Sequence, residues 1–181
     1  MTVSIYDSQQ VAKILLNINA VKLQPEKFFT WSSGKKAPIY CDNRLLLSYP
    51  KKREIIIKLL CKYIQKEFQS IDYIAGVATG AIAHGIMVAN ELNLPFIYVR
   101  SNAKQHGRQN QIEGRLEKRS NVVVIEDLIS TGKSSINAIN AINKTGSKVI
   151  GLTSIFTYEL FHKIEIPYFS ICTYSTLINE A

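Results

Sequence analysis

The spacing of the hydrophobic positions changes at about residue 71. Before that point the pattern predicts a first helix over residues 8–17, an irregular or hairpin region over 28–41, and a longer helix after Pro50. In the longer helix the apolar residues recur at intervals of three and four, at Ile56, Leu59, Leu60, Tyr63 and Ile64. From residue 71 onward, short apolar runs that suit strands alternate with helical patterns.

Four apolar runs in this second part are predicted to be strands, over residues 71–77, 96–99, 122–125 and 148–156. The run VVVI at 122–125 is wholly β-branched, which is typical of a strand buried on both faces. Helices are expected after residue 82 and around Ile136, Ile139 and Ile142, with Gly146 as the stop. This alternation predicts an α/β fold with a central, mostly parallel sheet flanked by helices.

The loops that follow three of these strands are expected to converge. The carboxyl ends of parallel strands lie at one edge of a sheet, and ligands bind beyond that edge. The loops in question begin at Gly76, Arg100 and Glu126. Because the 181 residues contain no repeat, low-complexity tract or linker, they are interpreted as a single domain, residues 1–181.

The strongest chemical signal is the stretch VVVIEDLISTGKSS at residues 122–135. A buried strand delivers two carboxylates, Glu126 and Asp127, to the sheet edge, and a loop over 128–134 then leads into a helix N-terminus, which attracts phosphate. Phosphate repels carboxylates, so the two acids are expected to face sugar hydroxyls, or a magnesium ion shared by ribose and pyrophosphate. The stretch therefore predicts a site for a ribose phosphate.

A P-loop is the competing interpretation, because Gly132-Lys133-Ser134 imitates the end of that motif. A P-loop requires another glycine five positions before the glycine of Gly-Lys, and this chain has Asp127 there. The P-loop is thereby excluded.

The same stretch resembles the phosphoribosyl pyrophosphate (PRPP) motif of type I phosphoribosyltransferases. Two further segments resemble the orotate phosphoribosyltransferase family: YVRSNAKQHGRQNQIEG at 98–114 is similar to its mobile active-site loop, and WSSGKKAPIYCDNR at 31–44 to its hood. TYEL at 157–160 also fits, after the last core strand. The resemblance spans nearly the whole chain, and it implies the type I phosphoribosyltransferase fold with a small hood formed mainly by residues 1–45.

The resemblance implies transfer of the 5-phosphoribosyl group from PRPP to orotate in pyrimidine biosynthesis, with Mg²⁺ as cofactor held by the substrate and Asp127 bound to it at most through water. It assigns the leaving pyrophosphate to the catalytic residues Arg100, Lys104 and His106. It assigns PRPP binding to Glu126, Asp127, Leu128, Ile129, Ser130, Thr131, Gly132, Lys133, Ser134, Thr79 and Gly80. Ser130, Lys35 and Arg44 are the expected orotate contacts, and the 100–114 loop is expected to be shared across a homodimer.

Two of these segments have a plainer interpretation when taken alone. GVATG at 76–80 is equally typical of a tight turn. The charges between residues 100 and 114, taken alone, are more typical of a solvated loop. Beside a polyphosphate site, the first becomes a pyrophosphate-binding turn and the second a lid.

Several positions depart from the family pattern. Ser32, Gly80 and Ser101 stand where many members have lysines, and Tyr158 stands where some have an arginine that contacts orotate. Lys35 or Arg44 is expected to compensate. The sequence leaves open whether Lys133, at a position usually occupied by a small residue, reaches the phosphate or points to solvent.

Charge and composition narrow the function further. The net charge of +8 and the pI of about 9.4 indicate anionic partners, which a spread basic surface, a nucleic-acid surface and a polyphosphate pocket would all explain. No nucleic-acid-binding motif is found, so small-molecule substrates are expected and nucleic acid is not. A nucleic-acid-binding regulator and a purine phosphoribosyltransferase are the alternatives.

The same composition favours a cytoplasmic protein. No stretch approaches the roughly 18 apolar residues of a membrane span, and the N-terminus does not resemble a signal peptide. Cys41, Cys61 and Cys172 are widely spaced and odd in number, so reduced and partly buried thiols are expected.

Overall fold

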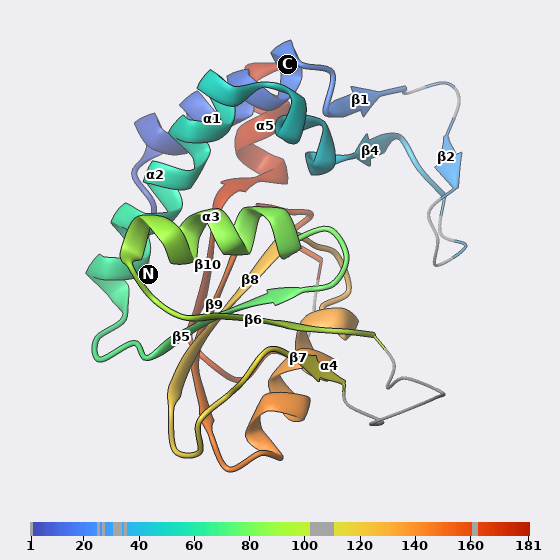
Figure 1. The fold of residues 1–181 in the computed structure, drawn as a ribbon. Coiled ribbons are helices and arrows are strands. Elements are labelled where there is room, and N and C mark those ends of the chain that lie inside the picture. The colour runs from blue at the N-terminus through green and yellow to red at the C-terminus, as the bar shows by residue number, and fades with distance from the viewer. Residues whose placement is uncertain are drawn as a thin grey trace.

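A six-stranded sheet forms the centre of the protein (Figure 1). The computed structural model describes residues 2–24, 26, 28–30, 34, 36–101, 111–160 and 163–181. The strand order is β10-β9-β8-β5-β6-β7, and every neighbouring pair is parallel except β6 with β7. The strands are β5 (Tyr73–Val77), β6 (Phe96–Val99), β7 (Ile112–Glu113), β8 (Asn121–Ile129), β9 (Lys148–Thr157) and β10 (Tyr168–Thr173). The predicted mostly parallel sheet is confirmed.

Helices cover both faces of this sheet (Figure 1). On one face lie α1 (Ile5–Asn17), α2 (Pro50–Glu67) and α3 (Ile82–Leu92), and on the other lies α4 (Lys133–Asn143). The side chains of β8 alternate between the two hydrophobic cores, with Val123 and Ile125 in the first and Val122 and Val124 in the second. All four are fully buried, which confirms the predicted strand with two buried faces.

The hood, defined here as β1 to β4 with the following 3-10 helix, projects beside the sheet (Figure 1). Strand β1 (Val21–Leu23) pairs with β4 (Ile39–Cys41), and β2 (Phe29–Thr30) pairs with β3 (Lys36–Ala37), so that of the two expected alternatives, irregular or hairpin, this region shows antiparallel pairing. The 3-10 helix η1 (Asn43–Ser48) then leads to α2. No helix in the described parts of the chain is long and apolar enough to cross a membrane.

Two predicted boundaries are wrong, and the pairing of β8 explains both. The strand was expected to end at residue 125, but β8 stays paired with β9 as far as Ile129 opposite Thr157. Helix α4 begins at Lys133. The expected loop over 128–134 is therefore only three residues long, Ser130 to Gly132, and both acids belong to the strand.

Strand β10 was not predicted, and the segment at 157–160 is therefore not the end of the core. The β10 sequence, YFSICT, mixes polar and apolar residues without clear alternation, yet Phe169 to Cys172 are all buried. Burial of Ser170 is compatible with the core because its hydroxyl bonds to that of Ser154 at 2.6 Å. Helix α5 (Tyr174–Glu180) follows β10 and was also not predicted.

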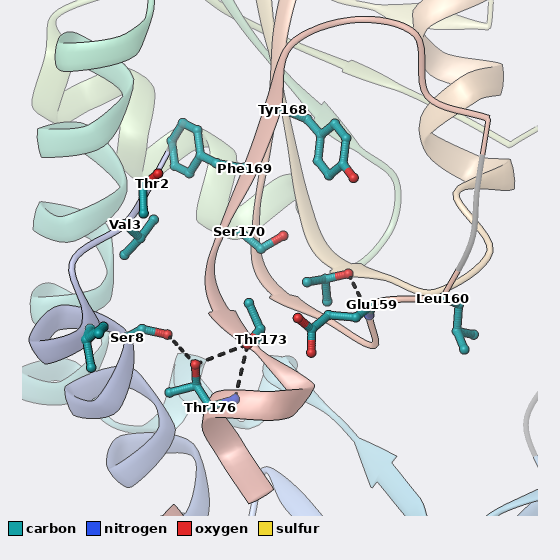
Figure 2. Close-up of a pocket in the computed structure, with 12 residues that line it drawn as sticks. Thr2, Val3, Ser8, Glu159, Leu160, Tyr168, Phe169, Ser170, Thr173 and Thr176 are labelled. Carbon is teal, nitrogen blue, oxygen red and sulfur yellow. Dashed lines mark hydrogen bonds between the residues drawn. The ribbon is translucent and has the colours of Figure 1, made fainter. Parts of the chain in front are cut away.

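A cavity of about 500 Å³, called the edge cavity here, lies along β10 (Figure 2). It is lined by the start of the chain, the end of β9, β10 and α5. Three of its hydroxyl side chains are bonded to one another: Ser8 donates to Thr176 at 3.2 Å, and the hydroxyls of Thr173 and Thr176 lie 3.1 Å apart. The described residues that line it include no basic side chain.

Candidate active site

The carboxyl ends of β5, β6 and β8 meet at one edge of the sheet, as predicted. Val77 at the end of β5 lies opposite Val99 in β6, and Gly76 lies opposite Ile125 in β8. The turn at 78–80 and residue 100 therefore follow neighbouring strands, and the acids at 126–127 lie in the part of β8 that extends beyond its pairing with β5. Parallel pairing thus brings together three segments that are far apart in the sequence.

A cavity of about 370 Å³, the site cavity, lies between this edge and the hood. The hood contributes Tyr40, Cys41, Asp42 and Arg44. The sheet contributes the turn after β5, the end of β8 with its loop, and the end of β9, through Thr79, Gly80, Asp127, Leu128, Ser130 and Tyr158. Its lining thus includes several residues that the sequence predicted for PRPP and orotate, from both the sheet edge and the hood.

The two adjacent acids point in different directions, because successive strand residues face opposite sides of a sheet. Asp127 lines the site cavity. Glu126 lies outside its lining, where its carboxylate accepts hydrogen bonds from Ser134 at 2.5 Å and Ser135 at 3.3 Å. Of the two predicted ribose contacts, only Asp127 is brought into the cavity lining.

Burial controls the protonation of both acids. It raises the pKa of Glu126, whose side chain is almost inaccessible, to about 8, against the bonds from the two serines. Burial also raises the pKa of Asp127, and the nearby Arg44 guanidinium opposes that rise. Perturbed carboxyl groups beside a cavity are typical of functional sites.

Gly80 allows the turn after β5 to lie against Asp127. A Cβ atom at residue 80 would collide with the Asp127 carboxyl group. The lysine that many family members place here would require Asp127 to move. The departure at Gly80 is therefore linked to the position of the acid.

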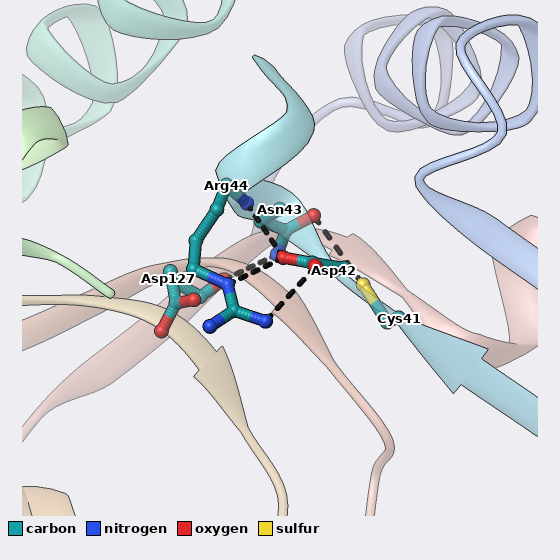
Figure 3. Close-up of polar contacts among 5 residues, drawn as sticks. All are labelled: Cys41, Asp42, Asn43, Arg44 and Asp127. Carbon is teal, nitrogen blue, oxygen red and sulfur yellow. Dashed lines mark hydrogen bonds and ion pairs between the residues drawn. The ribbon is translucent and has the colours of Figure 1, made fainter. Parts of the chain in front are cut away.

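Arg44 holds Asp42 through two parallel bonds at the mouth of the site cavity (Figure 3). Its Nε lies 2.6 Å from Oδ1 and its Nη2 lies 2.9 Å from Oδ2. This contact lowers the pKa of Asp42. Arg44 is the single basic side chain among the described residues of the lining, and its fork geometry suits a planar carboxylate.

The loop that leads to α4 lines this cavity through Ser130, and the helix begins at Lys133. Gly132 precedes the helix with a φ of +75°, a conformation that glycine adopts without strain, and no side chain caps the helix within the described chain. The main-chain N–H groups of its first turn are thus available to an anion. Thr131 and Lys133 are exposed, and Ser134 turns back to Glu126.

Other predicted residues lie elsewhere. Lys35, Lys104 and His106 lie outside the described residues, as does Ser32. Arg100 follows β6, but its guanidinium reaches Glu113 of β7 at 3.4 Å and does not line the site cavity.

Three residues of the site were missed or only partly understood from the sequence. Asn43 donates from its side chain to the Asp127 carbonyl at 2.6 Å, and Asp42 pairs with Arg44. Tyr158 accepts the Cys41 N–H at 3.1 Å, and burial raises the pKa of its hydroxyl. The only signal for Asn43 and Asp42 was their place beside Arg44 in the hood segment, and that place does not specify the partner of Asn43, which lies 84 residues away.

The phosphoribosyl transferase domain family matches residues 44–162. Orotate phosphoribosyltransferase of Staphylococcus haemolyticus is 46% identical over 96% of this chain and 89% of the relative, and that of Bacillus cytotoxicus is 50% identical over 96% and 85%. The solved orotate phosphoribosyltransferase from Aeropyrum pernix superimposes with a TM-score of 0.83 at 28% identity, over 94% of this chain and 97% of that one.

Proposed function

The chain belongs to the orotate phosphoribosyltransferase family, and from this premise we propose that it transfers the 5-phosphoribosyl group of PRPP to orotate. The products are orotidine 5′-monophosphate and pyrophosphate, and the reaction belongs to pyrimidine biosynthesis. The expected family and its type I phosphoribosyltransferase fold are confirmed. One observation carries the assignment to this site: the half-buried acid Asp127 at a strand end and the forked cation Arg44 line one cavity, together with Ser130 of the loop that leads to the uncapped N-terminus of α4.

The sugar phosphate is bound at the end of β8. Asp127 accepts hydrogen bonds from the ribose hydroxyls, and Glu126 supports the loop through Ser134. The 5-phosphate lies against the main-chain N–H groups and hydroxyls of residues 130–134, where the helix dipole favours negative charge. Leu128 and Ile129 place this loop by holding the end of β8 against β9.

Bond exchange takes place at the anomeric carbon of the ribose. Its bond to pyrophosphate breaks, and the ring nitrogen of orotate forms the new bond. Orotate is already an anion with a nucleophilic nitrogen, so a protein nucleophile is not needed. Orientation and charge stabilisation supply the rate enhancement.

The leaving pyrophosphate is bound by the turn at Thr79 and Gly80 through main-chain N–H groups. We assign Arg100, Lys104 and His106 to its developing charge, with His106 as proton donor. In the described structure Arg100 is held by Glu113, so this role requires it to exchange that partner for phosphate oxygens.

Orotate is held through its carboxylate by Arg44, with Lys35 and Ser130 as further contacts. The Arg44 side chain already binds a carboxylate, that of Asp42, with two parallel bonds. A substrate carboxylate would be recognised with the same geometry. Tyr158, where some family members have an arginine that contacts orotate, instead accepts a hydrogen bond from the hood main chain, so Arg44 is assigned the contact with the carboxylate.

The residues present fit Mg²⁺, which phosphoribosyltransferases generally use with PRPP. Magnesium is usually held by one or two carboxylates together with substrate phosphates and water, and Asp127 offers one carboxylate at the cavity. When bound, the ion would neutralise charge on the pyrophosphate. Asp127 would orient it through a water molecule.

We also propose a cytoplasmic homodimer in which the 100–114 loop is shared between subunits. The three free and buried cysteines fit a reducing compartment. The family resemblance of the loop supports the shared arrangement.

A phosphoribosyl transfer assay with PRPP, Mg²⁺ and a panel of bases tests the function. Formation of orotidine 5′-monophosphate and pyrophosphate from orotate is expected. Turnover of adenine or hypoxanthine without turnover of orotate would contradict the substrate and favour a purine enzyme. Salt-sensitive oligonucleotide binding without any transfer would favour a nucleic-acid-binding regulator.

A further inference from the structure

A partly buried hydrogen bond connects the hood to the end of β8 (Figure 3). The side-chain Nδ2 of Asn43 donates to the main-chain oxygen of Asp127 at 2.6 Å, across 84 residues of sequence. The Oδ1 of the same side chain accepts from the Cys41 thiol at 3.3 Å. Asn43 is 1% exposed, and loss of its side-chain amide would leave the Asp127 carbonyl without this hydrogen-bond donor.

A second hydrogen bond holds the hood on the N-terminal side of Asp42. The Cys41 N–H donates to the Tyr158 hydroxyl at the end of β9. The hood is therefore attached to β9 through Cys41 and to β8 through Asn43. Arg44 directly follows Asn43 in the chain, so the bond from Asn43 to the Asp127 carbonyl sets the backbone position of Arg44 relative to Asp127.

We propose that Asn43 is a positioning residue that fixes the distance between the orotate site at Arg44 and the ribose site at Asp127. This inference rests on the proposed function, which gives those two residues their substrates. The attacking nitrogen must lie about 3–3.5 Å from the anomeric carbon, and a displacement of about 1 Å can cost on the order of a hundredfold in rate. A rigid bond between the two half-sites keeps them at that separation.

Two substitutions test the bond. Asn43→Ala removes the donor, and Asn43→Asp keeps the shape but places an oxygen against the Asp127 carbonyl. We expect kcat/KM for orotate to fall at least about tenfold for the first and further for the second. Asn121→Ala is the matched control, because Asn121 donates from Nδ2 to the Ser70 carbonyl at 3.0 Å at the opposite end of β8. That control should stay within about twofold of the wild type.

A double-mutant cycle with Arg44→Gln separates positioning from a general loss of structure. If Asn43 acts through the placement of Arg44, its alanine substitution should cost less than about threefold in the Arg44→Gln background, against tenfold or more in the wild type. An equal loss in both backgrounds would overturn the inference. Thermal unfolding of each variant is followed in parallel, and Asn43→Asp carries the same cycle if the alanine variant is poorly folded.

The two levels of the account fail in different ways. A wild-type protein that does not turn over orotate would overturn the proposed function and this inference together. A wild type that turns over orotate, with Asn43→Ala indistinguishable from Asn121→Ala, would overturn the inference alone.

Discussion

The site cavity and the edge cavity have similar volumes, about 370 and 500 Å³, but their chemistry differs. In the edge cavity, hydroxyls from α1, β10 and α5 bond to one another, so little of their bonding capacity is left for a ligand. In the site cavity, a half-buried acid, Asp127, and a forked cation, Arg44, line the same space beyond the strand ends. An acid and a guanidinium together, and not volume, therefore mark the reactive region, because the described lining of the edge cavity has the acid Glu159 but no basic side chain.

The largest effect on activity is expected at Asp127 in the site cavity. Asp127→Asn removes the charge that faces the ribose and magnesium, so we expect kcat/KM for PRPP to fall by about a hundred- to a thousandfold. Steady-state kinetics with saturating orotate measure the loss. Unchanged kinetics would mean that the sugar site has been misplaced.

A second prediction concerns stability against pH. The pKa of Glu126 in the folded protein, about 8, lies above its ordinary value of 4.5. Its contribution to stability is therefore fully present below pH 4.5 and is lost as pH rises through 8. Gln does not titrate, so Glu126→Gln removes this loss. As the pH rises from 5 to 7, the unfolding free energy of the variant should therefore increase by about 2–3 kcal/mol relative to that of the wild type.

Chemical denaturation without ligands, at a series of pH values, measures that difference. The gain should be accompanied by weaker PRPP binding, since replacement of the acid alters the hydrogen bond that holds Ser134 at the start of α4. A difference in unfolding free energy that does not change with pH would contradict the buried, protonated state of Glu126.

Arg44 gives a smaller effect that separates base binding from sugar binding. Arg44→Gln should raise the KM for orotate by about ten- to thirtyfold, because a charged bidentate contact is lost. The dissociation constant of PRPP, measured by calorimetry, should change little. Arg115→Gln is the matched control, since Arg115 pairs with Glu117 at 2.8 Å on the exposed surface. An equal rise of KM in both variants would argue against orotate binding by Arg44.

The chemical core of the site was predictable from the sequence because it is local. A β-branched run, two acids and a loop before a helix lie within fourteen residues, and parallel strands then require the neighbouring loops to converge. Asn43 and Tyr158 could not be assigned their roles, since their partners are fixed only by how the hood folds onto β8 and β9. The opposite directions of Glu126 and Asp127 became clear only once the strand was seen to continue past them.

The smallest effect is expected in the edge cavity. Glu159 accepts hydrogen bonds from the Ser175 N–H and hydroxyl at 2.7 and 2.6 Å. Glu159→Gln should lower the unfolding free energy by at most about 1 kcal/mol. Its kcat/KM should stay within about twofold of the wild type. A loss comparable to that of Asp127→Asn would show that the edge cavity takes part in the reaction.

The most direct measurement is a crystal structure of the protein with orotidine 5′-monophosphate. We predict the phosphate at the N-terminus of α4, the ribose against Asp127 and the base carboxylate on Arg44. Density for the nucleotide in the edge cavity, or in any place that leaves the end of β8 empty, would contradict the account.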